Sequence, residues 1–162
     1  MKLFRNQGKQ FNKHGTLVRD GHFGRDPKCF KGIKYDSDGI KESEGLFVED
    51  KLQGKGILYY DNGSVRYKGE LKNDKGFGYG TCYHREGNKK YTGHFRNGKF
   101  DDIGEKYDYC GNLICKCLWD NGKVKQFLLS DEQHLSGFQV KEHEIFVYIG
   151  EVKNAEPHGI GS

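Results

Sequence analysis

The sequence predicts an all-β protein built as one elongated antiparallel sheet of stacked β-hairpins. Aromatic residues make up 14% of the 162 residues and only 2 residues are proline, a composition that favours half-buried strands and argues against disorder. Hydrophobic residues make up only 34% and the mean hydropathy is -0.89, which leaves too few apolar side chains for a thick core. The third observation is that many of the 24 glycines recur at a fixed interval.

Glycines and aromatic residues share this interval, which is 24 residues. Two glycine rows run through five positions each: Gly8, Gly32, Gly56, Gly80 and Gly104, and Gly15, Gly39, Gly63, Gly87 and Gly111. Two aromatic-rich rows keep the same phase: Phe11, Tyr35, Tyr59, Tyr83 and Tyr107, and Phe23, Phe47, Leu71, Phe95 and Trp119. A period of this length is typical of an array of supersecondary units, in which each unit packs on its neighbours.

Each unit is predicted to be a β-hairpin. From Tyr67 to Leu71 apolar residues and glycine alternate with charged residues, the pattern of a strand with one buried and one solvated face. Asn73–Lys75 then supplies a turn, Phe77–Tyr83 the returning strand, and Glu86–Gly87 a turn pair in which glycine can adopt a positive φ. Hairpins that pair edge to edge would advance about 10 Å per unit, which is two strand spacings.

The clearest units are YKGELKNDKGFGYGTCYHREGNKK, residues 67–90, and YTGHFRNGKFDDIGEKYDYCGNLI, residues 91–114. They resemble MORN repeats, whose pattern is Y-x-G-E-W-x-N-G, then G-x-G, an aromatic residue and a DG-type turn. Residues 19–42 and 43–66 resemble divergent copies, because Arg19 and Ser43 stand in place of the first tyrosine. The whole chain, 1–162, is thus expected to be a single array, completed by a half copy at 1–18, a degenerate copy with an insertion at 115–147 and a partial copy at 148–162.

The repeat loses its phase after Gln126. Tyr148 follows Cys115 by 33 residues, so about nine residues are inserted relative to the period. Within this stretch Ser130–Gln133 has the pattern of a capping box, with Gly137 as a stop, which predicts a short helical turn over residues 131–136. The apolar segment 144–152 is predicted to be a strand.

No catalytic motif stands out, and we expect no enzyme activity and no cofactor. Hydrolase, phosphate-loop and metalloprotease signatures are absent from the sequence, and its seven histidines do not all share one repeat position. Three closely spaced cysteines, Cys110, Cys115 and Cys117, raise the alternative of a zinc site. Because Cys115 and Cys117 replace the first tyrosine and glycine of the repeat, we expect them to pack as small buried thiols and predict no metal site.

The formal net charge is +4, which is too small by itself to indicate nucleic-acid binding, and we expect no nucleic-acid partner. Four lysines share one turn position and should form a basic ridge along one edge of the sheet: Lys51, Lys75, Lys99 and Lys123. Such a ridge suits acidic phospholipid headgroups or an acidic protein. The alternative is that the lysines only solvate and protect the sheet, with Asp50 and Asp74 offsetting part of their charge.

The resemblance implies a non-enzymatic scaffold that binds a protein partner along its sheet. The binding residues we expect are the four lysines and an aromatic set of Tyr59, Tyr83, Tyr107, Phe95 and Trp119. One alternative is peripheral membrane or phosphoinositide binding through the lysine ridge. Another is stoichiometric inhibition of a host or toxin enzyme, because similar repeats occur in antitoxin-like proteins. The unpaired edges of the terminal strands also predict a homodimer. With no signal peptide and no long apolar run in the sequence, we expect a cytoplasmic location, with peripheral membrane contact as an extension.

Overall fold

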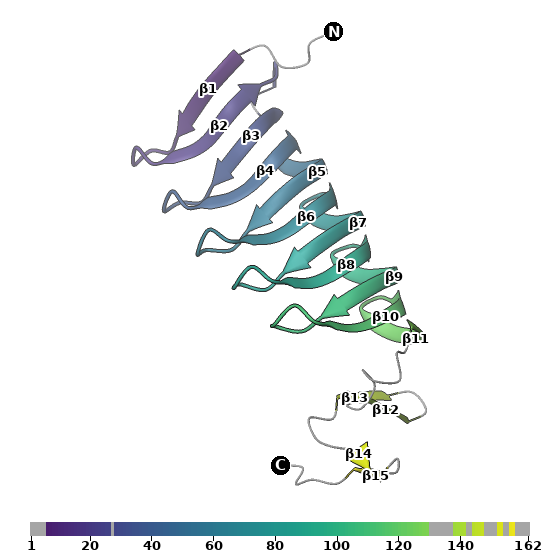
Figure 1. The fold of residues 1–162 in the computed structure, drawn as a ribbon. Helices are drawn as coiled ribbons and strands as arrows, with labels where there is room; N and C mark the ends of the chain where they lie inside the picture. The colour runs from purple at the N-terminus through teal and green to yellow at the C-terminus, as the bar shows by residue number, and fades with distance from the viewer. Residues whose placement is uncertain are drawn as a thin grey trace.

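A computed structural model of the chain describes residues 6–26 and 28–129, together with the backbone of four short strands nearer the C-terminus. In the first part, eleven strands form one antiparallel sheet in which each strand pairs with the next along the chain (Figure 1). These strands are β1 (Asn6–Phe11), β2 (Leu17–Phe23), β3 (Phe30–Tyr35), β4 (Lys41–Val48), β5 (Lys51–Tyr59), β6 (Val65–Lys72), β7 (Lys75–Tyr83), β8 (Lys89–Arg96), β9 (Lys99–Tyr107), β10 (Leu113–Asp120) and β11 (Lys123–Leu129). The predicted all-β hairpin array is therefore confirmed.

The connections alternate between two kinds of turn, which lie at opposite edges of the sheet. Five-residue loops at 12–16, 36–40, 60–64, 84–88 and 108–112 each close with two backbone hydrogen bonds, one of them donated by the glycine at the fourth position. At the other edge, four connections are two-residue turns: Glu49–Asp50, Asn73–Asp74, Asn97–Gly98 and Asn121–Gly122. All eight residues of these turns have positive φ, the backbone of a type I′ turn that matches the twist of a hairpin.

The 24-residue period of the glycines becomes a ladder across the middle of the sheet. Glycine pairs with glycine from β1 to β9, through Gly8, Gly21, Gly32, Gly45, Gly56, Gly69, Gly80, Gly93 and Gly104. The strands approach each other closely here, since a Cβ built on Gly21 would lie 2.4 Å from the carbonyl oxygen of Lys31. The ladder ends at Cys117 of β10, which pairs with Phe127 of β11.

Bare glycine backbone makes room for rings that lie across the sheet. A Cβ on Gly80 would lie 2.3 Å from the hydroxyl of Tyr67, and one on Gly104 would lie 2.1 Å from the hydroxyl of Tyr91. The Tyr67 hydroxyl donates a hydrogen bond to the carbonyl of Glu70 at 2.7 Å. Burial raises the pKa of both phenols well above its usual value. The glycine ladder therefore forms the floor on which the aromatic core rests.

The core is a single row of side chains on this face of the sheet. Its buried members are Phe30, Phe47, Leu52, Tyr67, Leu71, Tyr91, Phe95, Cys115, Cys117 and Trp119. Near the N-terminus the rings of Phe30 and Phe47 stack with centroids 4.3 Å apart. Near the C-terminus the contact between Tyr91 and Phe95 is edge to face at 5.1 Å. This row supplies the burial that a thin sheet otherwise lacks.

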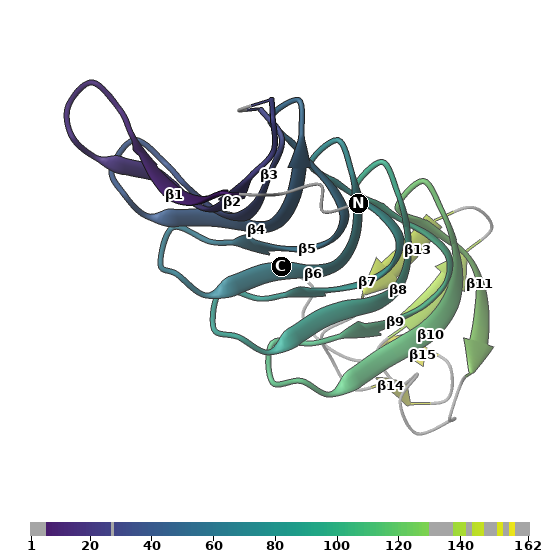
Figure 2. The ribbon, with the colours of Figure 1, turned by 90° about the horizontal axis from the view of Figure 1, so that it is seen from above.

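The strands are strongly curved, as the view along the array shows (Figure 2). Register shifts next to the glycine ladder mark β-bulges in the hairpins that end in two-residue turns. Equivalent bulge residues Gly54, Gly78 and Asp102 have φ of 70°, 60° and 55°. A β-bulge bends its strand and increases the local twist, and these bulges coincide with the curvature of the hairpins.

Two small two-stranded sheets follow along the chain: β12 (Phe138–Lys141) with β13 (Glu144–Val147), and β14 (Val152–Lys153) with β15 (Glu156–Pro157). The pairing of Lys153 with Glu156 is equivalent to that of Lys72 with Lys75 in the β6–β7 hairpin. The partial copy at 148–162 thus contains the start of a repeat hairpin. The helical turn predicted over 131–136 lies outside the described residues.

Candidate functional site

The four lysines predicted as a ridge do lie at one edge of the sheet, where they are the first residues of β5, β7, β9 and β11. We call Lys51, Lys75, Lys99 and Lys123 the lysine edge. All four side chains are exposed, and each residue directly follows a two-residue turn. The type I′ geometry of these turns therefore places one lysine at the same corner of every hairpin.

Hydrogen bonds between successive turns hold this edge in a regular row. The N–H of Gly98 donates to the carbonyl of Gly76 at 2.9 Å, and the N–H of Gly122 donates to the carbonyl of Phe100 at 2.8 Å. A Cβ built on Gly98 would lie 3.9 Å from the Cβ of Lys75, so each turn touches its neighbour. Successive lysines are then about 10 Å apart, two strand spacings.

The acidic residues beside the lysine edge are already engaged. Asp50 forms an ion pair with Arg19, and the Asp74 carboxylate accepts the backbone N–H of Leu52 at 2.8 Å. The last two turns, Asn97–Gly98 and Asn121–Gly122, carry no charge. Within the described part of the chain none of the four lysines forms an ion pair, and Asp74 keeps its negative charge beside Lys75.

Tyr59, Tyr83 and Tyr107 end β5, β7 and β9 and do not belong to the buried row. The hydroxyl of Tyr59 donates to Glu44 at 3.0 Å and that of Tyr107 donates to Glu105 at 2.8 Å. Glu105 alternates with the ladder residue Gly104, so it projects from the face opposite the core. Burial, followed by the hydrogen bond to the glutamate, raises the pKa of Tyr59 and of Tyr107 to about 12.

Phe95 and Trp119 lie in the buried row, and each is only 6% exposed. The indole N–H of Trp119 donates to the carbonyl of Gly104 at 3.4 Å, and its ring meets Tyr91 edge to face at 5.7 Å. The aromatic set predicted to bind a partner is therefore split between the two faces of the sheet: three half-buried tyrosines lie on one face and two core rings on the other.

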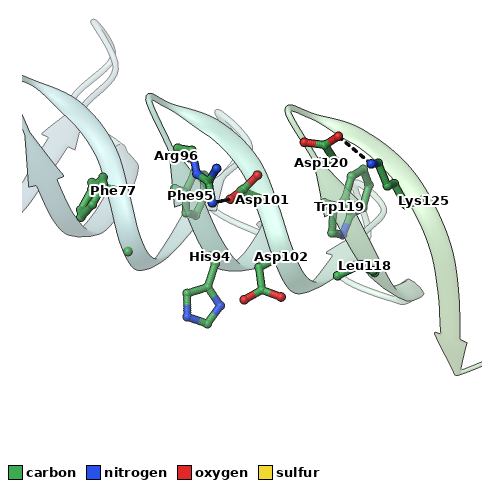
Figure 3. Close-up of a pocket in the computed structure, with 11 residues that line it drawn as sticks. Phe77, His94, Phe95, Arg96, Asp101, Asp102, Leu118, Trp119, Asp120 and Lys125 are labelled. Carbon is green, nitrogen blue, oxygen red and sulfur yellow. Dashed lines mark ion pairs between the residues drawn. The ribbon is translucent and has the colours of Figure 1, made fainter.

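An open groove of about 480 Å³ lies over the curved ends of β7–β11 (Figure 3). Edges of Phe95 and Trp119 form part of its lining. The other lining residues are Phe77, Gly78, His94, Arg96, Asp101, Asp102, Leu118, Asp120 and Lys125. Asp102 pairs in register with Trp119 across β9 and β10, and the groove is thus centred on the bulge of β9.

The charged side chains around the groove are mostly paired with one another. Arg96 contacts Asp101 at 2.9 Å, and Lys125 contacts Asp120 at 2.9 Å (Figure 3). The Asp102 carboxylate is exposed and forms no ion pair or hydrogen bond with the residues that the structure describes. The groove therefore combines aromatic edges with one uncompensated negative charge.

Comparison with known families decides what kind of array this is. The MORN repeat family matches residues 44–65, 67–89, 91–101 and 148–162. The chain is a MORN-repeat protein. The first three matched stretches run from within β4 to the start of β9, and the continuous glycine ladder joins these strands. A search of curated proteins found no match to this MORN chain. MORN repeats are non-catalytic modules that generally mediate protein and membrane interactions.

The MORN pattern also identifies groove residues that sequence reasoning missed. Asp102 occupies the bulge position that Gly54 and Gly78 hold in the preceding copies, and His94 stands where the earlier copy has Glu70. A search for residues that depart from the repeat would have found Asp102, whereas the position of His94 varies from copy to copy and is also histidine at His22. Their meeting at one groove depends on the bulge, which the period does not reveal.

The cysteines lie where the packing interpretation expected them. Cys115 and Cys117 are buried in β10, whereas Cys110 is exposed in a loop. A hydrogen bond between the thiols of Cys115 and Cys117 lowers the pKa of Cys115 and raises that of Cys117. No group of three or more potential metal ligands occurs among the described residues. The same residues include no helix long and apolar enough to cross a membrane.

Proposed function

We propose that this MORN array is a non-enzymatic interaction module that binds a protein partner along its sheet. The observation that supports it best is a cluster of exposed apolar side chains next to the groove. Phe77 is 43% exposed, Tyr79 57% and Ile103 45%. Aromatic and large aliphatic side chains at an exposed surface are typical of protein interfaces.

These three residues come from neighbouring positions of the array. Tyr79 of β7 pairs with His94 of β8, and their rings meet edge to face at 5.6 Å. Ile103 of β9 pairs with Leu118 of β10, which also lines the groove. The cluster and the groove together offer a continuous surface across four strands, on elements whose backbone is fixed by the ladder.

A pull-down with the full chain tests the proposal. The bait is compared with a Tyr79→Ser/Ile103→Ser variant and with a Tyr109→Ser control, since Tyr109 is 72% exposed in a loop at the opposite edge. We expect a protein retained by the wild type and the control and lost with the double variant. Equal recovery by all three baits would overturn the assignment to this surface. A tight stoichiometric complex with one enzyme would instead favour the inhibitor alternative.

The lysine edge favours a second candidate, peripheral binding to acidic phospholipid. Each lysine close to an anionic membrane contributes about 1 kcal/mol, and the attraction is screened by salt. We expect the wild type to sediment with vesicles rich in acidic lipid at low salt. A variant with Lys51, Lys75, Lys99 and Lys123 changed to Glu should remain in the supernatant. Sedimentation of both proteins, or of neither, would contradict this candidate.

A further candidate partner is a second copy of the chain. Strands β1 and β11 each pair with only one neighbour in the eleven-strand sheet, and unpaired strand edges favour pairing with another sheet. Light scattering of the full chain over a range of concentrations tests for a homodimer. A constant monomer mass would exclude it over that range.

A further inference from the structure

We propose that the groove beside Asp102 is a subsite for a basic side chain of the protein partner, an arginine or a lysine. This inference rests on the proposed function, because it names the chemistry by which that partner is recognised. It is carried by three observations: the charge balance of the groove, the exposed ring of Phe77 and the volume of the groove.

The charge balance leaves one carboxylate to be neutralised. The ion pairs of Arg96 with Asp101 and of Lys125 with Asp120 account for four of the charged side chains that line the groove. Asp102 is left exposed beside His94, and in the close-up both side chains extend to the same side of the ribbon (Figure 3). In a chain with a net charge of +4, this part of the groove has the opposite sign and complements a cationic group.

One aromatic ring at this surface already accepts a cation. The ammonium of Lys72 lies 5.5 Å from the ring centroid of Phe77, which lines the groove. The Phe77 side chain is 43% exposed, so its ring is accessible to a cation of the partner that enters the groove. A guanidinium group combines flat stacking on a ring with bidentate bonds to a carboxylate, so arginine suits such a site particularly well.

The volume of the groove, about 480 Å³, lies in the range of about 300 to 1,000 Å³ that is usual for ligand sites. The groove is also held by rigid elements, because its lining residues belong to five paired strands. A single long side chain with its flanking backbone can therefore enter without rearrangement of the sheet.

Asp102 can be changed without breaking the fold. Its φ of 55° matches those of Gly54 and Gly78, so Asp102→Gly restores the residue that the preceding copies use. Asp102→Asn keeps the size of the side chain, and asparagine tolerates positive φ. Asp38→Asn is the matched control, because Asp38 is an exposed carboxylate in the loop at 36–40, away from the groove.

The test is a selection of random peptides displayed against the full chain, followed by measurement of affinity. Trp119 is the only tryptophan and lines the groove, so its fluorescence reports occupancy by peptides that lack tryptophan. We expect the selected peptides to contain an arginine or lysine whose change to glutamine weakens binding about 10-fold, as for a charge pair at an interface. The Asp102→Asn and Asp102→Gly chains should bind the parent peptide about 10-fold more weakly and should be indifferent to that glutamine change.

Three results would overturn the inference. These are equal affinity of the parent peptide for the wild type and the Asp102 variants, enrichment of peptides without a basic residue, and no enrichment at all. Asp38→Asn should bind as the wild type does. If apolar peptides bind the groove and the partner is still captured in the pull-down, the subsite is wrong and the interaction module stands. If neither peptides nor a partner bind, both proposals fail.

Discussion

At the scale of single residues, the glycines of the ladder matter through the atom that they lack. The ring of Tyr91 occupies the space that a Cβ on Gly104 would need. Such a Cβ would lie 2.1 Å from the Tyr91 hydroxyl oxygen. Gly8 belongs to the same ladder, but a Cβ there would lie 3.8 Å from the nearest atoms, those of the Phe23 ring, which is ordinary contact. Two glycines with one role in the repeat thus differ in how much space surrounds them.

We therefore predict that Gly104→Ala lowers the free energy of unfolding by about 1–3 kcal/mol, the usual cost of forcing an extra carbon into a packed core. The matched change Gly8→Ala should have an effect of less than about 0.5 kcal/mol, as expected for a position with free space. Denaturant unfolding followed by circular dichroism measures both. Equal destabilisation by the two changes would mean that the ladder requires glycine for its backbone rather than for the ring above it.

The tyrosines on the face opposite the core make the stability of the folded protein decrease at alkaline pH. The folded-state pKa of Tyr59 is about 12, above its ordinary value of 10.0, because of burial and the hydrogen bond to Glu44. A raised pKa means that folding favours the protonated phenol, so the stabilisation is fully present below pH 10 and is lost as the pH rises toward 12. The Tyr107–Glu105 pair adds to the same loss.

Glu44→Gln should lower the pKa of Tyr59 toward 10, because it removes the negative charge that disfavours the phenolate. A titration of phenolate absorbance should then show one tyrosine ionising at lower pH than in the wild type. The control is Glu86→Gln, which changes an exposed glutamate in a loop. Identical titration curves for Glu44→Gln and the wild type would show that the hydrogen bond to Glu44 does not raise the pKa of Tyr59.

At the scale of the hairpin, the two-residue turns decide the register, and one of them departs from its equivalents. Glu49 has φ of 51°, nearly the same as the 52° of the equivalent residues Asn73, Asn97 and Asn121, but it is a glutamate where the other three turns have asparagine. Asparagine tolerates this left-handed backbone better than glutamate does, because its short side chain bonds locally. The first copy with such a turn therefore contains a residue poorly suited to its conformation.

Glu49→Asn should raise the free energy of unfolding by about 0.5–1 kcal/mol, a size typical of a backbone conformation that becomes easier to adopt. Glu49→Gln removes the same charge without improving the turn and is the control. Chemical denaturation of the three proteins decides the matter. A gain for Glu49→Gln as large as that for Glu49→Asn would attribute the effect to charge.

The hairpins were predictable because their signals are local and repeated. Turn pairs such as Asn62–Gly63 and the alternation from Tyr67 to Leu71 fix strand ends and the buried face independently in each copy. The set of residues that lines the groove was not predictable, because it depends on the bulges. A bulge inserts residues on one strand only, so Asp102 leaves the period-two pattern and lines the groove together with His94. Spacing along the sequence carries no record of that displacement.

At the scale of the whole molecule, the sheet is a one-dimensional array in which each strand contacts its neighbours. Contacts between strands more than one apart in the chain are few, so local stability follows local packing rather than a shared core. The packing is uneven. Strand β8 buries Tyr91, Gly93 and Phe95, whereas β1 contains no buried residue. The N-terminal end of the array should therefore open more readily than its centre.

Hydrogen exchange followed by mass spectrometry should show this gradient. We expect the slowest exchange in the amides of β7–β9, where the rings of Tyr91, Phe95 and Phe100 meet, and faster exchange in β1. Phe100→Leu should raise exchange in β8–β10 and leave β1–β3 unchanged, because the strands between them transmit little of the loss. Uniform exchange along the sheet, or a Phe100→Leu effect that reaches β1–β3, would mean that the array unfolds as one cooperative unit.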